Sequence, residues 1–275
     1  STTIDDNKKH SNCLRLAFLG CEVLPPYGPY EHTATLFADL IASSWSLAIQ
    51  QQQQQQQQEK QTEENQNKQQ LTLILDVFAA SSSSQQNDKS DDIPPRLPSR
   101  DELSSGCYDG VILPGSFASA YDGPNVPWVG ALEEWIRDIL VPSQLPALGV
   151  CFGHQLYAHS LPGGKAVKCP AGPQAGTKPC ALTPFGRRTT FLFSQPSDDE
   201  KKEENENGSQ RSVDLFYVHG DMVESLPPSG VSLGGNEKVP IQAALYGTAL
   251  MEDERRPNET EHPIEKPTAT AVTFQ

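Results

Sequence analysis

The stretch best suited to chemistry is a cysteine flanked by glycines, Gly149-Val-Cys-Phe-Gly153, which follows an apolar run and precedes a predicted helix. This pattern is typical of a strand-to-helix elbow, where glycines leave room for a strained turn that exposes the middle side chain. Cys151 would then sit at a helix N-terminus, whose dipole and free N–H groups favour the nucleophilic thiolate. The alternative is a buried cysteine in a tight turn that performs no chemistry.

A second turn, Leu113-Pro-Gly-Ser116, follows another apolar run and can present backbone N–H groups. Acyl transfer needs two donors aimed at the oxyanion that develops on the attacked carbonyl. The N–H groups of Ser116 and Phe152 are the natural pair if the two turns lie together. Taken alone, the Pro-Gly pair is more simply interpreted as the end of a strand.

Alternating apolar runs and amphipathic stretches predict the elements that would position these turns. In the first half, strands are expected at 14–20, 71–78, 109–114 and 146–150, and helices at 31–49, 126–140 and 152–161. This order is typical of an α/β fold with a doubly wound, mostly parallel sheet. The second half has only short runs, which favour antiparallel strands added to the same sheet. They lie at 165–167, 180–183, 189–193, 215–218, 241–246 and 270–274.

Three segments together resemble the class I, triad-type glutamine amidotransferase domain. Gly149–Gln155 is similar to that family's nucleophile motif, Gly110–Ser116 to its oxyanion strand, and Tyr217–Val223 to its glutamine-clamping loop. The resemblance implies a three-layer, flavodoxin-like sheet with added antiparallel strands. Cys21-Glu22 and residues 28–33 are similar to the small stand-alone members of fungi and plants, which are related to γ-glutamyl peptidases.

The resemblance also implies a role for each site residue. Cys151 would attack the γ-carboxamide of glutamine, or of another γ-glutamyl compound, to form a thioester that water or another nucleophile resolves. The N–H groups of Ser116 and Phe152 would form the oxyanion hole. Gln155 would hold the amino acid head of the substrate together with the backbone of Val218, His219 and Gly220. Gln155 could instead be a helix residue satisfied by a neighbouring loop.

The base and its orienting carboxylate are the part of the pattern that this sequence lacks. In the family both come from a His-Pro-Glu motif after the strand that here resembles residues 270–275. His154 and His219 are better interpreted as structural, and His159 as a helix-surface residue. We therefore expect a C-terminally truncated fragment with little hydrolytic activity of its own. The alternative is a relative that has lost catalysis and serves as a binding or scaffolding module.

The 275-residue, 30.0-kDa chain is uneven in composition, and its net charge of −14 lies mostly outside the predicted core. Low-complexity stretches at 50–70, 81–104, 196–212 and 252–267 carry −1, −2, −3 and −3, which is −9 of that charge. We interpret them as surface insertions, because loop-closure entropy grows slowly with loop length. They would interrupt a single domain, residues 14–275, that follows a disordered tail, residues 1–13.

Composition also limits the partners. An acidic chain without a basic stripe is not expected to bind nucleic acid, and no run approaches the roughly 20 apolar residues of a membrane span. The six cysteines lack metal-binding spacing, which favours free thiols in a reducing, cytoplasmic setting, with no metal and no cofactor. The expected partners are glutamine or a γ-glutamyl peptide and, if ammonia is passed on, an unidentified synthase.

Overall fold

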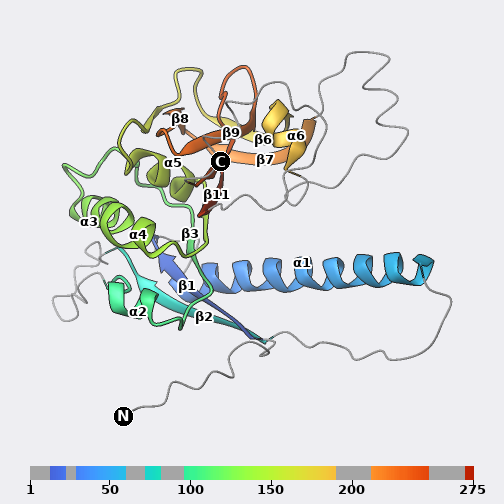
Figure 1. Cartoon of the computed structure of the whole chain (residues 1–275). Helices are drawn as coiled ribbons and strands as arrows, with labels where there is room; N and C mark the ends of the chain where they lie inside the picture. Colours follow the sequence, from blue (N-terminus) through green and yellow to red (C-terminus); the bar gives the residue numbers. More distant parts are fainter. Residues whose placement is uncertain (1–12, 23–28, 60–71, 82–95, 190–211, 248–269) are drawn as a thin grey trace, which may run out of the picture.

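The computed structural model describes residues 13–22, 29–59, 72–81, 96–189, 212–247 and 270–275 (Figure 1). Within them, nine strands form one sheet in the order β2-β1-β3-β4-β11-β10-β9-β6-β7, and β5 pairs with β8 in a separate ribbon. The sheet consists of β1 (Cys13–Gly20), β2 (Thr72–Ala79), β3 (Gly110–Leu113), β4 (Ala147–Val150), β6 (Gln174–Leu182), β7 (Ser212–His219), β9 (Gly230–Gly235), β10 (Ala243–Tyr246) and β11 (Ala271–Phe274). The ribbon consists of β5 (Lys165–Lys168) and β8 (Asp221–Ser225).

The helices are α1 (Tyr30–Glu59), α2 (Arg100–Ser104), α3 (Pro127–Trp135), α4 (Val141–Ser143), α5 (Phe152–His159) and α6 (Pro184–Arg188). A π-helical segment, Ile136–Leu140, joins α3 to α4. The predicted helix at 126–140 is therefore present, but its backbone widens in the second half. The predicted α/β fold with helices on both faces of a sheet is confirmed.

The parallel half of the sheet has the doubly wound strand order 2-1-3-4-5, with β11 in the fifth place. In such sheets the carboxyl ends of neighbouring strands meet at one edge, and ligands bind at the point where the chain switches direction across the sheet. The segments after β1, β3 and β4 all leave from this edge. The fold therefore places the two predicted turns, which follow β3 and β4, next to each other.

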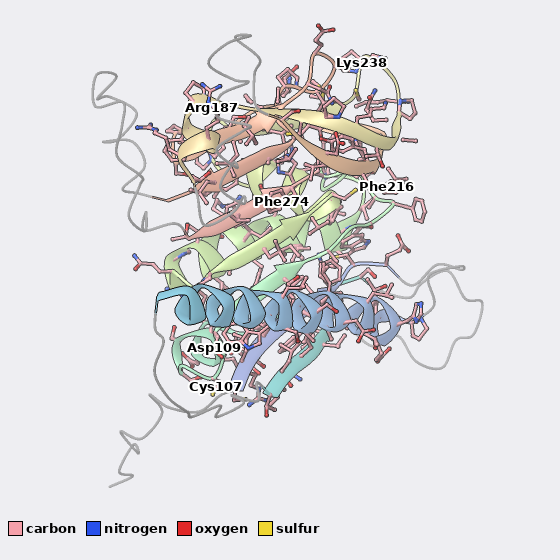
Figure 2. The ribbon with its side chains drawn as sticks, turned by 90° about the vertical axis from the view of Figure 1, so that its right-hand side faces the viewer. Cys107, Asp109, Arg187, Phe216, Lys238 and Phe274 are labelled. Carbon is pink, nitrogen blue, oxygen red and sulfur yellow. The ribbon has the colours of Figure 1, made fainter. Side chains whose placement is uncertain are left out.

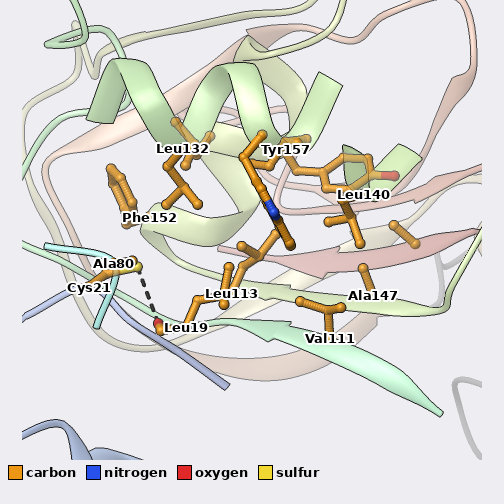
Figure 3. Close-up of a cluster of buried hydrophobic side chains, with 14 of the residues drawn as sticks. Leu19, Cys21, Ala80, Val111, Leu113, Leu132, Leu140, Ala147, Phe152 and Tyr157 are labelled. Atoms are coloured by element: carbon orange, nitrogen blue, oxygen red, sulfur yellow. Dashed lines mark hydrogen bonds between the residues drawn. The ribbon is translucent and has the colours of Figure 1, made fainter. Parts of the chain in front are cut away.

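Period-two alternation along β1 builds two separate cores. Leu16 and Phe18 face α1, which contributes Ala34, Phe37 and Ile41 to that side. The intervening residues of β1 face the opposite layer, where they pack with α3 and α5 in the larger core. In Figure 3, Leu19 and Leu113 from the strands lie below Leu132 and Phe152 from the helices. The three-layer arrangement thus follows from the alternation of apolar residues in the central strands.

Most short strands of the second half pair antiparallel, as predicted. The prediction is wrong for 270–274, because β11 pairs parallel with β4 on one side and antiparallel with β10 on the other. β10, β9, β6 and β7 extend the sheet beyond β11 by antiparallel pairing. The predicted strand at 165–167 does not join that sheet; it forms β5 and pairs with β8. Of the predicted strand at 189–193, Thr189 ends α6, and 190–193 lie outside the described residues. Five elements of the described part were not predicted: β8, β9, α2, α4 and α6.

The helix predicted at 31–49 continues through the glutamine tract to Glu59, so α1 is the longest helix described (Figure 1). Leu36, Leu40 and Leu47 on this helix are more than half exposed. No helix in the described part of the chain combines the length and apolarity that crossing a membrane requires. Within the predicted insertion at 81–104, the last residues form α2, which begins with a capping box between Ser99 and Glu102.

Candidate active site

Cys151 occupies the strained position that the glycine pattern predicted. It lies between β4 and α5 with φ 52° and ψ −107°, a left-handed backbone that only glycine adopts at little cost. A Cβ atom on Gly153 would collide with the backbone carbonyl of Leu113, and one on Gly149 would lie 2.9 Å from the carbonyl oxygen of Gly153. Gly153 is therefore required for the elbow to pack against β3, and Gly149 for the end of β4 to lie close to the first turn of α5.

Backbone hydrogen bonds tie the elbow to the strands on both sides. Cys151 N–H donates to the carbonyl of Phe274 at the end of β11 (2.8 Å), and Gly153 N–H donates to the carbonyl of Pro114 after β3 (3.1 Å). A Cβ atom on Gly115 would be in van der Waals contact with that of Cys151, at 3.6 Å. The structure thus brings together the cysteine and the Pro114–Ser116 turn, as the sequence predicted.

The half-buried Cys151 thiol has a raised pKa. Burial is the main cause, and the carboxylate of Asp221 adds to it, while a hydrogen bond from the Phe152 N–H works in the opposite direction. The prediction that the helix N-terminus would favour thiolate is therefore only partly met. The Phe152 N–H does stabilise the anion, but desolvation outweighs it, so nucleophilic attack needs a group that removes the thiol proton.

The predicted clamp residues lie on the far side of the cysteine. Cys151 Sγ approaches the carbonyl oxygen of Val218 at 3.9 Å, near the end of the edge strand β7. The Gly220 carbonyl accepts from Cys169 N–H (2.9 Å), which fixes the turn between β7 and β8. Gln155 is buried, and its Nε2 donates to the carbonyl of Asp221 (3.2 Å). That bond is the neighbouring-loop contact of the alternative interpretation; whether Gln155 also binds substrate stays a prediction.

Both histidines of α5 are engaged in structural contacts. His154 is fully buried, with Nδ1 2.7 Å from Thr273 Oγ1 and Nε2 3.2 Å from the carbonyl of Ile241. Burial lowers its pKa to about 4, so the ring is neutral near pH 7. His159 Nδ1 accepts from the Ala166 N–H (3.1 Å), so this half-buried residue links α5 to β5 instead of lying free on the surface.

His219 in the clamp is also buried. Its Nδ1 lies 2.9 Å from the carbonyl oxygen of Asp221, which can only accept, so Nδ1 carries the proton. Desolvation, the larger effect, lowers its pKa. Nε2 is then a buried acceptor without a hydrogen-bond partner among the described residues. The ring orientation is set by the strand that follows it, as expected for a structural histidine.

Two carboxylates beside the site were not predicted as site residues. Asp221 accepts hydrogen bonds from Ser119 Oγ (2.7 Å) and Tyr121 OH (3.0 Å). Glu22, two residues after β1, accepts from the N–H of Phe117 (3.1 Å). Both carboxylates directly follow strands that end at the site edge, and that position is the signal that could have identified them. No group of three or more potential metal ligands occurs in the described part of the chain.

The chain is similar to several known proteins. The family model Glutamine amidotransferase class-I matches residues 50–244. A glutamine-hydrolysing GMP synthase of Porphyromonas gingivalis is 31% identical over 134 residues, which make up 49% of this chain and 21% of the synthase. Gamma-glutamyl peptidase 5 of Arabidopsis thaliana is 26% identical over 146 residues, 52% of this chain and 51% of the peptidase. The chain thus spans about a fifth of the synthase and about half of the peptidase.

The fold is also found among solved structures. A glutamine amidotransferase from Thermotoga maritima superposes with a TM-score of 0.51 and 16% sequence identity, covering 97% of this chain and 76% of that one. At this identity the similarity shows the shared fold alone.

We expect Gly153→Ala to lower the free energy of unfolding by about 3 kcal/mol, the upper end of overpacking costs, because backbone would have to move to admit the methyl group. Gly220→Ala is the matched control, since nothing lies within 4 Å of its added Cβ atom. Urea titration of both variants measures the effect. A loss below about 1 kcal/mol in the first variant would show that the elbow can relax.

A small model thiol has a pKa of about 8.5, so its alkylation by iodoacetamide reaches half the maximal rate near that pH. We expect the alkylation of Cys151 to reach its half-maximal rate at a higher pH. The reason is that burial raises the pKa of this thiol, so the thiolate fraction grows later as the pH rises. Mass spectrometry of the Cys151 peptide between pH 6 and 10 gives the profile. A plateau by pH 8 would contradict the desolvation argument.

Proposed function

Because the chain belongs to the class I glutamine amidotransferase family, we propose that Cys151 attacks a γ-glutamyl amide and forms a thioester that water then hydrolyses. The observation that carries this proposal is the position of Cys151. It stands on a left-handed elbow with the Pro114–Ser116 turn on one side and the Val218 carbonyl 3.9 Å from its sulfur on the other. A γ-carboxamide placed between them would meet the nucleophile and the backbone donors together.

The proposed reaction divides into two acyl-transfer steps. The sulfur adds to the carboxamide carbon, and the developing oxyanion accepts hydrogen bonds from the N–H groups of Phe152 and Ser116. The amine leaves as ammonia or as the remainder of a γ-glutamyl peptide, and water then cleaves the thioester. The raised pKa of Cys151 means that a base must take the thiol proton. We assign neither His154 nor His219 to that role, because each ring is held by the structural contacts described above.

We propose that the head of the substrate is recognised by charge as well as by backbone. The Asp221 carboxylate influences the Cys151 thiol electrostatically and is oriented by two hydroxyl groups. It makes no ion pair within the described residues. An α-ammonium group would supply the missing positive charge, while Gln155 and the backbone of Val218, His219 and Gly220 would contact the rest of the amino acid head.

The names of two relatives support two substrate classes. One is a glutamine-hydrolysing synthase and the other a γ-glutamyl peptidase, so glutamine and γ-glutamyl peptides are the proposed substrates. With glutamine, a synthase partner would receive the ammonia. All six cysteines are free thiols, and buried Cys169 and Cys180 remain unpaired, which supports a reducing compartment such as the cytoplasm.

A second candidate function is binding without catalysis. Two observations favour it: the pKa of the Cys151 thiol is raised, and His154 and His219 are held in structural contacts. Such a protein would bind glutamine without forming a thioester. A covalent probe separates the two functions.

We expect a glutamine-derived chloroketone to modify Cys151 selectively and glutamine to slow that modification, because the probe presents its ketone where the carboxamide would lie. Cys107 is the internal control for general thiol reactivity, because it is exposed and lies far from Phe274, the residue that binds the elbow (Figure 2). Mass spectrometry of both peptides reports the selectivity. Binding of glutamine without any chloroketone adduct on Cys151 would favour the binding module. The absence of both glutamine binding and the adduct would contradict both functions.

We expect Asp221→Asn to weaken protection by glutamine roughly 10- to 100-fold, because a charge-assisted hydrogen bond contributes about 1.5–3 kcal/mol. The substitution keeps the size of the side chain and removes its charge. The matched control is Asp214→Asn on the exposed surface of β7, which should leave protection unchanged. The glutamine concentration that halves the labelling rate measures the effect, and equal values for the two variants would exclude Asp221 from recognition.

A further inference from the structure

The Ser116 side chain is held on three sides. Its Oγ lies 3.2 Å from the carbonyl oxygen of Cys21 and 3.3 Å from Glu22 Oε2, so the hydroxyl hydrogen is shared between these acceptors. The same oxygen accepts from the N–H of Ala118 (3.1 Å). The hydroxyl therefore links the segment after β1 to the segment after β3.

Glu22 makes a second contact with the same turn. The N–H of Phe117 donates to Glu22 Oε2 at 3.1 Å, so one carboxylate oxygen receives both Ser116 Oγ and the next backbone amide. β1 and β3 are parallel neighbours, with Phe18 opposite Ile112, which brings their carboxyl ends together. Glu22 thus spans the place where the chain switches direction across the sheet.

These contacts fix the side chain of the proposed oxyanion donor and the backbone that follows it. The side chain of Ser116 and the following amide are both held by the β1 segment, so rotation of the turn is opposed at two points. Oxyanion stabilisation depends on donors that are oriented before the charge develops. We propose that Glu22 is a positioning residue that orients the Ser116 N–H toward the oxyanion, a role that rests on the proposed function.

Glu22 could act on the oxyanion in two ways, by orienting the Ser116 N–H or through its own charge. A negative carboxylate near the turn opposes a developing oxyanion, so the charge of Glu22 would not by itself favour the reaction. Its acceptor oxygen is the useful feature. Glu22→Gln retains an acceptor and removes the charge, whereas Glu22→Ala removes both, so the two variants distinguish positioning from charge.

Two electrophiles make the test specific to the oxyanion. The thiolate adds to the carbonyl carbon of the glutamine-derived chloroketone and places negative charge on its oxygen. The sulfur then displaces chloride from the adjacent carbon, and the first carbon–sulfur bond breaks as the ketone re-forms, which leaves a thioether. Iodoacetamide loses iodide at a saturated carbon and needs no oxyanion donor. We expect Glu22→Ala to lower the ratio of chloroketone to iodoacetamide rates at Cys151 about tenfold, less than the roughly 100-fold for complete loss of a donor. Glu22→Gln should stay within about threefold of the parent protein.

Hydrogen exchange at the Phe117 amide provides a second readout, because Glu22→Ala removes its acceptor and should reduce its protection. Glu134→Ala, on the exposed side of α3, is the control for both measurements. A parent protein whose Cys151 reacts with iodoacetamide but not with the chloroketone would contradict the proposed function, and the positioning role with it. The positioning role alone would be overturned if the parent protein reacts with both reagents but Glu22→Ala leaves the ratio of the two rates, or the hydrogen-exchange protection of Phe117, unchanged.

Discussion

The left-handed backbone of Cys151 is the constraint on which the rest of the site depends. Its φ of 52° costs on the order of 1–3 kcal/mol for a residue other than glycine, and the surrounding structure must supply that energy. Hydrogen bonds at the elbow itself offset this cost: the Cys151 N–H donates to the carbonyl of Phe274, and the Gly153 N–H donates to the carbonyl of Pro114. Both neighbours of β4 thus bond to the elbow, β11 on one side and β3 on the other, and the two turns meet because β3 and β4 are adjacent.

Electrostatics and geometry oppose each other at this elbow. Burial and the carboxylate of Asp221 raise the pKa of Cys151, and a second carboxylate, Glu22, holds the neighbouring turn. Both carboxylates disfavour anions, yet the proposed chemistry passes through a thiolate and an oxyanion. The conflict is resolved if the acidic groups act on parts other than the reacting atoms. Asp221 suits an ammonium group, and Glu22 suits a backbone amide, while the N–H donors face the developing charge.

The sequence predicted those features that depend on local patterns. Apolar runs of four to eight residues predicted the parallel strands β1 to β4, and the spacing of Gly149 and Gly153 predicted the elbow. It missed β9, whose Gly-rich sequence, Gly230–Gly235, has little strand propensity, and α6, which has only five residues with Gly186 at its centre. Glu22 and Asp221 were missed as site residues because their partners are 94 to 102 residues away in the sequence. The raised thiol pKa could not be predicted either, because it depends on burial.

The low-complexity segments explain why overall charge says little about the site. β10 and β11 pair in register although 24 residues separate Tyr246 from Thr270, whose N–H donates to the Tyr246 carbonyl at 2.7 Å. Doubling the length of such a connection adds only about 0.6 kcal/mol of closure entropy, less than a few strand hydrogen bonds contribute. The fold can therefore retain long acidic connections at small cost, and most of the charge of −14 accumulates there. The charges that matter at the elbow are instead local: Asp221, two residues after β7, acts on the Cys151 thiol, and Glu22, two residues after β1, binds the neighbouring turn.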